Sequence, residues 1–496
     1  MMMLKGFAPD LPESAEGVMT ECINLVPTEI GFKSAQKLVP ASVNNKVSDT
    51  KVIGAALVTR LDNINRFYAG TGTQMFELKG NEWVDQTRDS GAYTGGAENR
   101  WRFVQFGNDT VAANQLDVIQ YSRNGKFEDI PGAPKARIIE AVAGFVMAFG
   151  IVDEVEGDMP DMWWCSALYN HLDWKPDVAK NSANGRLIDS PGEIRAAKKL
   201  GNSIVAYKEK SMYLGHFVGP PVVWQWQQIP GEIGAVSHES VVSIDTAHLF
   251  IGSDDFWVFD GSRPVSIGAP IRNWFFENAS PQHLHQSQGY YDRKNGLVYW
   301  HFANKNSDGR LNDCLVYNVK THAWGRILRT INTVAEHKSS GVTYDQLGDL
   351  YATFDDFDKI SYKSPRWFSD GSSMAIIDQH NCLMLADGGG ENSSFTTGII
   401  GSDSYYSTIK RVRPHFILYP KSGIMRTRHG STAGSPLKDG STAGSPLKDG
   451  STAGSPLKDG KFDVLKSARW HKLQFYFTGD VEISALDIDL ARNGYR

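Results

Sequence analysis

Short apolar strands recur along the chain, and each is followed by a turn and a second, more aromatic strand. Such pairs run through residues 66–80, 248–261 and 297–318. Gly, Asn and Asp stand at the corners between alternating side chains, which is the pattern of antiparallel strand pairs. The sequence therefore predicts a chain built from many small antiparallel sheets.

The spacing of these pairs favours a radial arrangement. Their first strands follow one another at intervals of 37 to 59 residues, and propeller blades repeat at roughly 40–50 residues. A four-stranded blade hides both faces only when it stacks on neighbours around an axis. We expect an all-β fold with a β-propeller of about seven blades, with a set of β-sandwiches as the alternative. The aligned positions are Phe67, Val104, Val146, Val205, Leu249, Val298 and Leu350.

The chain changes character near residue 371, where polar runs appear between strands predicted at 408–419, 470–478 and 481–490. Residues 431–460 repeat one decapeptide three times, with a single leucine as the only large apolar residue of each unit. Such a segment buries too little surface to offset its ordering entropy, which indicates a long loop. The predicted domains are an N-terminal arm (1–50), a propeller (51–370) and a C-terminal β-sandwich-like domain (371–496) carrying the repeat loop 431–460.

Helix is expected only at two places. Ser190 and Glu193 flank a proline in a capping-box pattern that predicts a helix ending near Leu200. Residues 270–278 would add a turn or two.

Composition limits the function. A formal net charge of −5 and a pI near 6.2 argue against a protein that grips nucleic acid over its whole surface. The four cysteines are scattered without metal-like spacing, which favours free thiols and a reducing compartment. Residues 1–13 lack the pattern of a signal peptide, and no long apolar run predicts membrane insertion. We expect a soluble product made in the cytoplasm.

Acidic pairs at Asp254–Asp255 and Asp355–Asp356 are candidates for glycosidase chemistry, which needs two carboxylates about 5–10 Å apart. Each pair lies at a predicted turn, where Asp is favoured for turn geometry alone. His283 and His285 would share one face of a strand as half of a metal site, but no further ligand lies nearby in sequence. We therefore expect no enzyme, and no catalytic, cofactor-binding or metal-binding residue.

One basic segment is a candidate contact surface. Alternation along a strand would place Arg411, Arg413 and His415 on one face, next to Lys410, and Arg426 and Arg428 follow shortly. These side chains would face DNA or an acidic partner. A solvated strand edge protected by charge is an equally good interpretation.

Two N-terminal stretches, Lys5-Gly-Phe-Ala-Pro-Asp-Leu and Cys22-Ile-Asn-Leu-Val-Pro-Thr, resemble the opening of tail-hub proteins of short-tailed bacteriophages. These are also called nozzle or packaged-DNA stabilisation proteins. Further similar segments lie at 132–137, 161–167, 252–261 and 469–481. The likeness is thus spread over most of the chain.

The resemblance implies a structural protein of the virion tail, assembled in the host cytoplasm as a homohexameric ring below the portal and head-to-tail adaptor. The ring would continue the channel for double-stranded DNA without reading its sequence and help retain packaged DNA until ejection. It would also attach a needle, fibres or spikes. The triple repeat departs from the family pattern and inherits no role. A propeller enzyme active on glycans (a depolymerase or sialidase) and a non-catalytic receptor-binding module are the alternatives.

Overall fold

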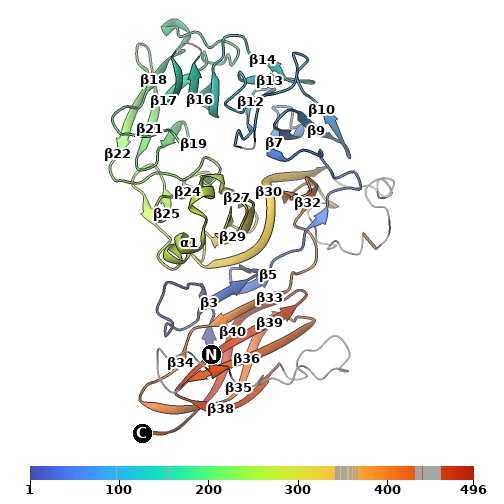
Figure 1. Ribbon diagram of the computed structural model, residues 1–496, viewed down its shortest axis with the longest axis vertical. Coiled ribbons are helices and arrows are strands. Elements are labelled where there is room, and N and C mark those ends of the chain that lie inside the picture. Colours follow the sequence, from blue (N-terminus) through green and yellow to red (C-terminus); the bar gives the residue numbers. More distant parts are fainter. Residues whose placement is uncertain are drawn as a thin grey trace.

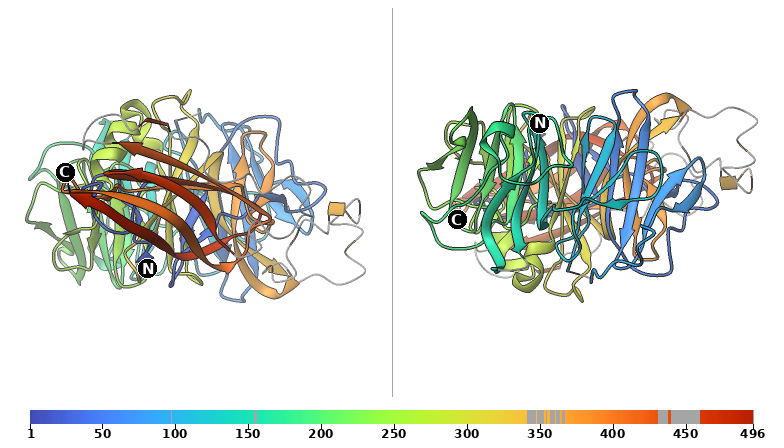
Figure 2. Two further views of the ribbon diagram at one scale, coloured as in Figure 1. Left: turned by 90° about the horizontal axis from the view of Figure 1, so that it is seen from below. Right: turned by 90° about the horizontal axis from the view of Figure 1, so that it is seen from above.

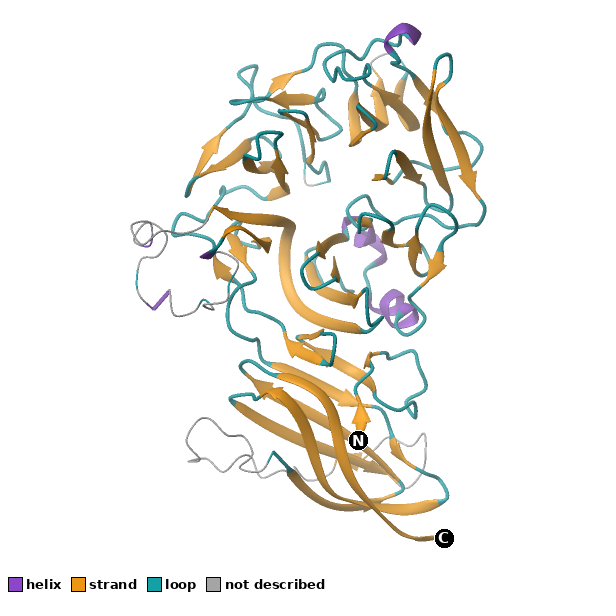
Figure 3. Cartoon of the chain, turned by 180° about the vertical axis from the view of Figure 1, so that it is seen from behind, coloured by secondary structure: helices purple, strands orange, loops and turns teal. Residues whose placement is uncertain are grey.

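The computed structural model describes residues 1–96, 98–153, 156–340, 347, 353, 355–356, 360, 364, 367–430, 438–439 and 460–495. A wheel of small sheets forms one end of the molecule, and a long β-sandwich forms the other (Figure 1). Strands dominate both bodies (Figure 3), so the all-β prediction is confirmed. The helices with defined bounds in the described part of the chain are η1 (Val178–Lys180), α1 (Arg272–Asn278) and η2 (Pro281–Gln286). None of the helices described is long and apolar enough to cross a membrane.

Five blades of the wheel are separate four-stranded antiparallel sheets. Blade 1 holds β7 (Val52–Thr59), β8 (Asn65–Thr71), β9 (Met75–Lys79) and β10 (Glu82–Asp85). Blade 2 holds β11 (Arg102–Phe106), β12 (Asp109–Ala113), β13 (Gln120–Ser122) and β14 (Glu128–Asp129). Blade 3 holds β15 (Lys135–Val142), β16 (Phe145–Asp153), β17 (Gly157–Cys165) and β18 (Asn184–Arg186). Blade 4 holds β19 (Ala196–Leu200), β20 (Ser203–Tyr207), β21 (Met212–Gly219) and β22 (Val223–Ile229). Blade 5 holds β23 (Val242–Ser243), β24 (His248–Ile251), β25 (Phe256–Phe259) and β26 (Val265–Ser266).

The last two blades share one long strand, β30 (Trp324–Ser340). Its first half completes blade 6 beside β27 (Gln288–Asp292), β28 (Leu297–Phe302) and β29 (Leu311–Asn318). From Ile331 onward it pairs with β31 (Ser369–Asp378) and begins blade 7, which continues through β32 (Leu383–Leu385) to β6 (Val39–Pro40). The second half of β30 also lies against β7. Blade 7 therefore closes the wheel of seven blades.

The apolar runs that indicated the blades in the sequence belong mainly to the second strand of each blade. β12, β24 and β28 are buried along their whole length, because neighbouring blades cover both of their faces. Strands covered on both faces show continuous apolar runs. Five of the seven aligned positions lie on such second strands: Phe67, Val146, Val205, Leu249 and Val298. Val104 lies instead on β11, the innermost strand of blade 2, and Leu350 lies outside the described residues.

Two face-to-face sheets form the sandwich. One contains β4 (Leu25–Pro27), β5 (Phe32–Ser34), β40 (Glu482–Tyr495), β35 (Tyr405–Leu418) and β38 (Phe462–Ala468), with β1 (Met2–Met3) on β40. The other contains β2 (Gly6–Phe7), β3 (Val18–Ile23), β33 (Ser393–Thr397), β39 (Trp470–Thr478), β36 (Ser422–Gly430) and β37 (Lys438–Asp439), with β34 (Ile400–Gly401) on β39. Seen from below, the long strands of the sandwich run across the near end of the molecule (Figure 2, left). Burial alternates along β39, which leaves one face toward the core.

The N-terminal segment is divided between the two bodies. β1 to β5 pair within the sandwich, where β4 also pairs with β30 of blade 6, and β6 supplies the outermost strand of blade 7. Later in the chain, β31 and β32 extend the same blade to Leu385. The boundaries predicted at residues 50 and 370 therefore do not coincide with the edges of the two bodies. Long-range pairing sets those edges, and local composition does not report it.

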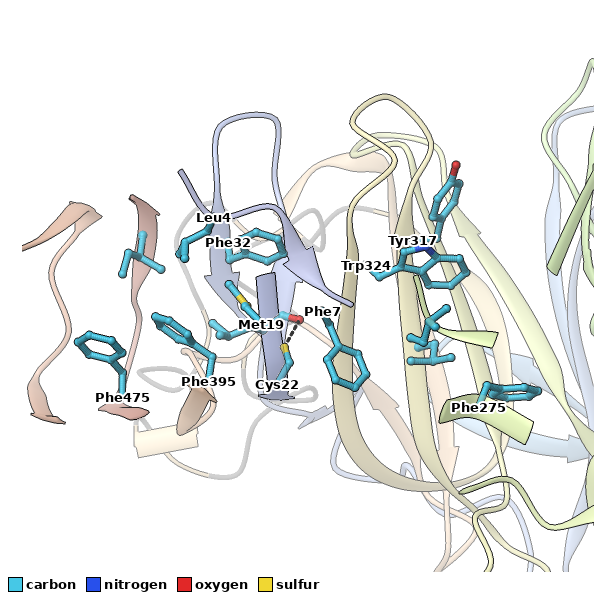
Figure 4. Close-up of a cluster of buried hydrophobic side chains, with 14 of the residues drawn as sticks. Leu4, Phe7, Met19, Cys22, Phe32, Phe275, Tyr317, Trp324, Phe395 and Phe475 are labelled. Carbon is cyan, nitrogen blue, oxygen red and sulfur yellow. Dashed lines mark hydrogen bonds between the residues drawn. The ribbon is translucent and has the colours of Figure 1, made fainter. Parts of the chain in front are cut away.

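A single buried cluster joins wheel and sandwich. Trp324 of blade 6 belongs to the same cluster as Phe395 and Phe475 of the sandwich, and N-terminal strands lie between them (Figure 4). Phe7 on β2 meets Trp274 edge-on, with ring centroids 5.0 Å apart. Interfaces that are large and apolar restrict motion between domains. We infer that wheel and sandwich act as one rigid unit.

The helix predicted at residues 190–200 is wrong. Ala196–Leu200 forms β19, the innermost strand of blade 4. The Ser190 hydroxyl bonds to the side chains of Ser211 and Tyr213 rather than capping a helix. Tertiary pairing outweighed the local capping signal. The short helix expected at 270–278 is confirmed as α1.

Candidate functional site

The predicted basic face of β35 exists, but acidic residues accompany it. Arg411 and Arg413 are exposed and alternate with buried Val412. Arg411 forms an ion pair with Asp463 on β38 at 2.8 Å. On the other side, β40 places Asp489 opposite Arg411 and Asp487 opposite Arg413. Arg411 therefore has carboxylates on both neighbouring strands, and Arg413 has one opposite it on β40.

Two other predicted residues of this group lie in the opposite sheet. Arg426 and Arg428 are on β36, whereas β35 belongs to the first sheet of the sandwich. The guanidinium of Arg426 stacks over Tyr476 at 5.2 Å from the ring centroid. Lys410 is exposed on β35 beside the bulge that separates Ile409 from Arg411 in the register, and His415 follows on the same strand. The structure thus does not gather the six residues Lys410, Arg411, Arg413, His415, Arg426 and Arg428 into one site.

Asp254 and Asp255, one of the two candidate carboxylate pairs for a glycosidase, lie in different environments. Asp255 is buried and accepts hydrogen bonds from Ser266 Oγ at 2.6 Å and Arg272 Nη1 at 3.0 Å. Asp254 is exposed. Asp255 therefore holds blade 5 together, joining its outermost strand to α1. In the second pair, the carboxylate of Asp356 accepts a hydrogen bond from Thr353 Oγ1 at 2.9 Å, and the N–H of Asp356 donates to the Thr353 carbonyl at 3.2 Å.

The two candidate histidines lie on a 3-10 helix rather than on a strand, which corrects the sequence interpretation. His283 and His285 are both on η2, and His285 Nε2 lies 2.9 Å from Glu98 Oε2. Among the described residues, no group of three or more His, Cys, Asp or Glu side chains is arranged to hold a metal ion.

A polar cavity at the axis of the wheel is the most developed site, and sequence reasoning missed it. The innermost strands β7, β11, β15, β19, β23, β27 and β30 contact one another in a closed circuit. A cavity of about 420 Å³ lies where these strands begin. Each blade contributes a polar residue at or near the start of its innermost strand. These are Lys51, Arg100, Arg102, Arg137, Glu193, Arg195, Glu239, Gln288 and Asn332.

Four arginines and two glutamates form the inner part of this cavity, which we call the axial arginine cluster (Arg100, Arg102, Arg137, Arg195, Glu193 and Glu239). Arg102 grips Glu239 with two hydrogen bonds, Nε to Oε1 at 2.7 Å and Nη2 to Oε2 at 3.1 Å. The Nε of Arg100 lies 3.5 Å from the same carboxylate, and its Nη2 donates to Gln288 at 2.9 Å and to Thr333.

The second half of the cluster has the same composition. Arg137 Nη1 donates to Glu193 Oε2, and Arg195 Nε lies 3.5 Å from the other oxygen of that carboxylate. Arg195 also reaches Glu209 with Nη2 at 3.2 Å, outside the cavity lining. Two arginines therefore share each glutamate inside the cavity.

Burial and the close approach of these charges shift the pKa values of Glu239, Arg100 and the neighbouring His238. Burial opposes ionisation of Glu239, but the charges of Arg102 and Arg100 outweigh it and hold the pKa of Glu239 well below its usual range. Burial lowers the pKa of Arg100 to about 10, against the attraction of Glu239 and with the repulsion of Arg102. Burial also lowers the pKa of His238 beside them, so this imidazole is neutral at pH 7. In formal charge, the four arginines of the cluster outnumber its two glutamates.

A sequence signal for this cluster exists in retrospect. Arg100-Trp-Arg102, Lys135-Ala-Arg137 and Glu193-Ile-Arg195 each place charges two residues apart at the entry to an apolar strand. Such alternation is also typical of exposed strand ends. Only the radial geometry brings the three motifs to one axis.

Comparisons with known proteins add little to this description. No protein-family model matches the chain, and no curated protein matches its sequence. Among solved structures, the chain is similar to a crystal structure of the computationally designed Ika8 protein, at 10% identity with a TM-score of 0.35. That match covers 71% of this chain and 99% of the designed protein. A similarity this low carries no argument about function.

Proposed function

We propose that the chain is a non-enzymatic structural subunit of a short-tailed phage tail. It would form the ring-shaped hub, or nozzle, below the portal and adaptor, and it would be built into the virion after assembly in the host cytoplasm. The sequence resemblance is the origin of the proposal. The observation that carries it further is the shared core between wheel and sandwich, in which Trp324, Phe395 and Phe475 belong to one buried cluster.

The shared core is suited to a protein that transmits mechanical force. A tail hub holds back packaged DNA and passes force between the head and the distal fibres, needle or spikes. A hinge between two bodies would dissipate such force, whereas a continuous apolar interface transmits it. The N-terminal strands strengthen the connection because they pair in the sandwich before β6 enters blade 7.

The charge arrangement on the sandwich suits a surface that DNA passes without being held. Arg411 is paired with Asp463, and Asp487 and Asp489 lie opposite the basic residues of β35. Affinity for DNA grows with the number of phosphates that cations neutralise. Cations already compensated by carboxylates give weak, sequence-independent contact, which a conduit requires.

An exposed apolar tip offers a surface for self-association. Ile417, Leu418 and Tyr419 at the turn between β35 and β36 are 46%, 50% and 59% exposed. Aromatic residues such as Tyr are enriched at protein interfaces, and the buried core of an interface is more apolar than the rest of the surface. β38 is the last strand of its sheet among the described residues, and an open edge invites pairing with another chain.

The mass of the purified full-length chain in solution tests the proposal. We expect a closed ring, with six copies as the number implied by the resemblance, and ring-shaped particles in electron micrographs. Tyr419→Asp should shift the mass toward the monomer, because it places a charge in the apolar tip. Tyr169→Asp is the matched control, since Tyr169 is 78% exposed on blade 3, away from the sandwich.

A chain that remains monomeric at high concentration, and that is missing from purified virions, would remove the proposal. Hydrolysis of host polysaccharide that is lost in Asp254→Asn would instead favour the glycan-active alternative. Strong binding to host cells by the isolated monomer would favour the receptor-binding module.

A further inference from the structure

The axial arginine cluster has more cationic groups than the cavity's carboxylates can satisfy. Arg100 and Arg102 share Glu239, and Arg137 and Arg195 share Glu193. Lys51 and Arg310 add further cations to the cavity lining, against one more carboxylate, Glu98, which bonds to His285 and Gln286. Burying several like charges close together is costly unless an opposite charge joins them. The fold thus maintains an excess of positive charge around a space of about 420 Å³.

Donor groups in this cavity also remain without acceptors. The Nε of Arg195 is buried and has only the 3.5 Å ion-pair contact with Glu193 Oε1, with no hydrogen bond among the described residues. The hydrogen bonds of Arg100 within the described part of the chain use its Nη2, and those of Arg137 use its Nη1. An unsatisfied buried donor costs roughly 1–3 kcal/mol, which a bound acceptor would relieve. The guanidiniums are therefore held in place with spare N–H groups.

We propose that the axial cavity binds a phosphate group, either as inorganic phosphate or as the phosphate of a nucleotide. Guanidinium forks match the oxygens of phosphate in two-point hydrogen bonds. A dianion neutralises two excess cations at once, which a carboxylate does not. The cavity volume of about 420 Å³ exceeds what a bare phosphate fills and lies in the range of small-molecule sites, so a nucleotide base and sugar have room. This inference does not rest on the proposed role in a phage tail.

Phosphate recognition would use Arg102 differently from the other three arginines of the cluster. Arg102 is committed to Glu239 by its bidentate contact, so it fixes the orientation of that carboxylate. Arg100, Arg137 and Arg195 have the spare donors and would contact the phosphate oxygens. Lys51 would attract the anion at the mouth through its charge, at longer range.

Titration of the full-length chain with sodium phosphate at low ionic strength tests the proposal, with sodium chloride at equal ionic strength as reference. We expect a heat of binding by calorimetry that saturates at millimolar phosphate or below, and an unfolding temperature that rises with the logarithm of the phosphate concentration. Saturation of the binding heat distinguishes binding at a site from the general stabilising effect of excluded phosphate salts, which has no binding isotherm. A second arm uses a nucleoside monophosphate, and tighter binding there than for phosphate would assign the nucleotide source. A third arm uses acetate.

Arg195→Gln should weaken phosphate binding at least about tenfold, because charge-assisted hydrogen bonds contribute more than neutral ones. Lys51→Gln, at an exposed position, should weaken it a few-fold and serves if Arg195→Gln does not fold. Arg263→Gln is the control, since Arg263 is exposed at the turn before the outermost strand of blade 5. No saturable response to either phosphate ligand overturns the proposal. So does equal saturable binding of acetate, or equal weakening of phosphate binding by Arg263→Gln.

Discussion

Replacing Glu239 by Gln is the sharpest test of the axial arginine cluster. The substitution preserves the size of the side chain but removes the carboxylate that Arg100 and Arg102 share. The amide oxygen of Gln can still accept a hydrogen bond from Arg102. Its NH₂ group, however, places a donor against the N–H donors of a guanidinium. Both arginines keep their charges in a partly desolvated site, with side chains only 18% and 14% exposed.

The magnitude follows from the interactions of the Glu239 carboxylate. It makes a bidentate pair with Arg102 at 2.7 and 3.1 Å and a third interaction with Arg100 at 3.5 Å. Removing one partner of a fully buried pair costs about 3–5 kcal/mol. The cavity admits some water, so we expect Glu239→Gln to destabilise the wheel by about 2–4 kcal/mol.

The pH dependence gives a second check with a defined sign. Because the folded pKa of Glu239 is held below its usual range, its stabilising contribution is fully present above the unfolded pKa of about 4.3. That contribution is lost as the pH falls through the folded pKa. The stability difference between wild type and Glu239→Gln should therefore be constant from about pH 8 to pH 5 and shrink below about pH 4.

Thermal unfolding measures the effect, with Glu29→Gln as the matched control. Glu29 pairs with Lys320 at 2.6 Å, but both side chains are more than 60% exposed, and exposed pairs contribute little. We expect a loss of at least roughly 3 °C for Glu239→Gln and no measurable shift for the control. If phosphate occupies the cluster, added phosphate should restore part of the lost stability. Equal unfolding temperatures for both variants would refute the account of the axial charges.

Three further predictions concern the rest of the chain. Phe7→Ala should destabilise the junction of the two bodies by about 3–5 kcal/mol because it removes a buried ring that contacts Trp274; denaturant unfolding measures this, and a change below about 1 kcal/mol would contradict it. Burial lowers the pKa of His248 to about 4, and its imidazole bonds to Tyr207 at 2.7 Å. The unfolded chain gains a proton there below about pH 6.5 while the folded chain does not, so stability should fall by up to roughly 3 kcal/mol between pH 6.5 and pH 4; His248→Gln should flatten this slope in urea titrations. Deletion of residues 431–450 should leave the unfolding temperature unchanged, because the remaining repeat unit can still close the loop, and a large loss would show that the repeats pack against the body.

Much of the strand content was accessible from the sequence because it reflects local burial. β28 is buried on both faces and shows an unbroken apolar run. β39 is covered on one face and alternates. The predicted C-terminal strands at 408–419, 470–478 and 481–490 correspond to β35, β39 and β40. A strand's own side chains carry this information, so it needs no knowledge of partners.

The tertiary structure alone decided how those strands close into a wheel and which side chains line its axis. β6 pairs with β32 across more than 340 residues of sequence, and Ile331 marks the point where one strand passes from blade 6 to blade 7. Likewise, Arg102 and Glu239 meet although 137 positions separate them. The amino-acid sequence determined that the chain forms small sheets covered on their faces, because burial shapes each strand locally. The axis and its charges arise only when all seven blades are in place, because the strongest pairs of the cluster join residues from different blades.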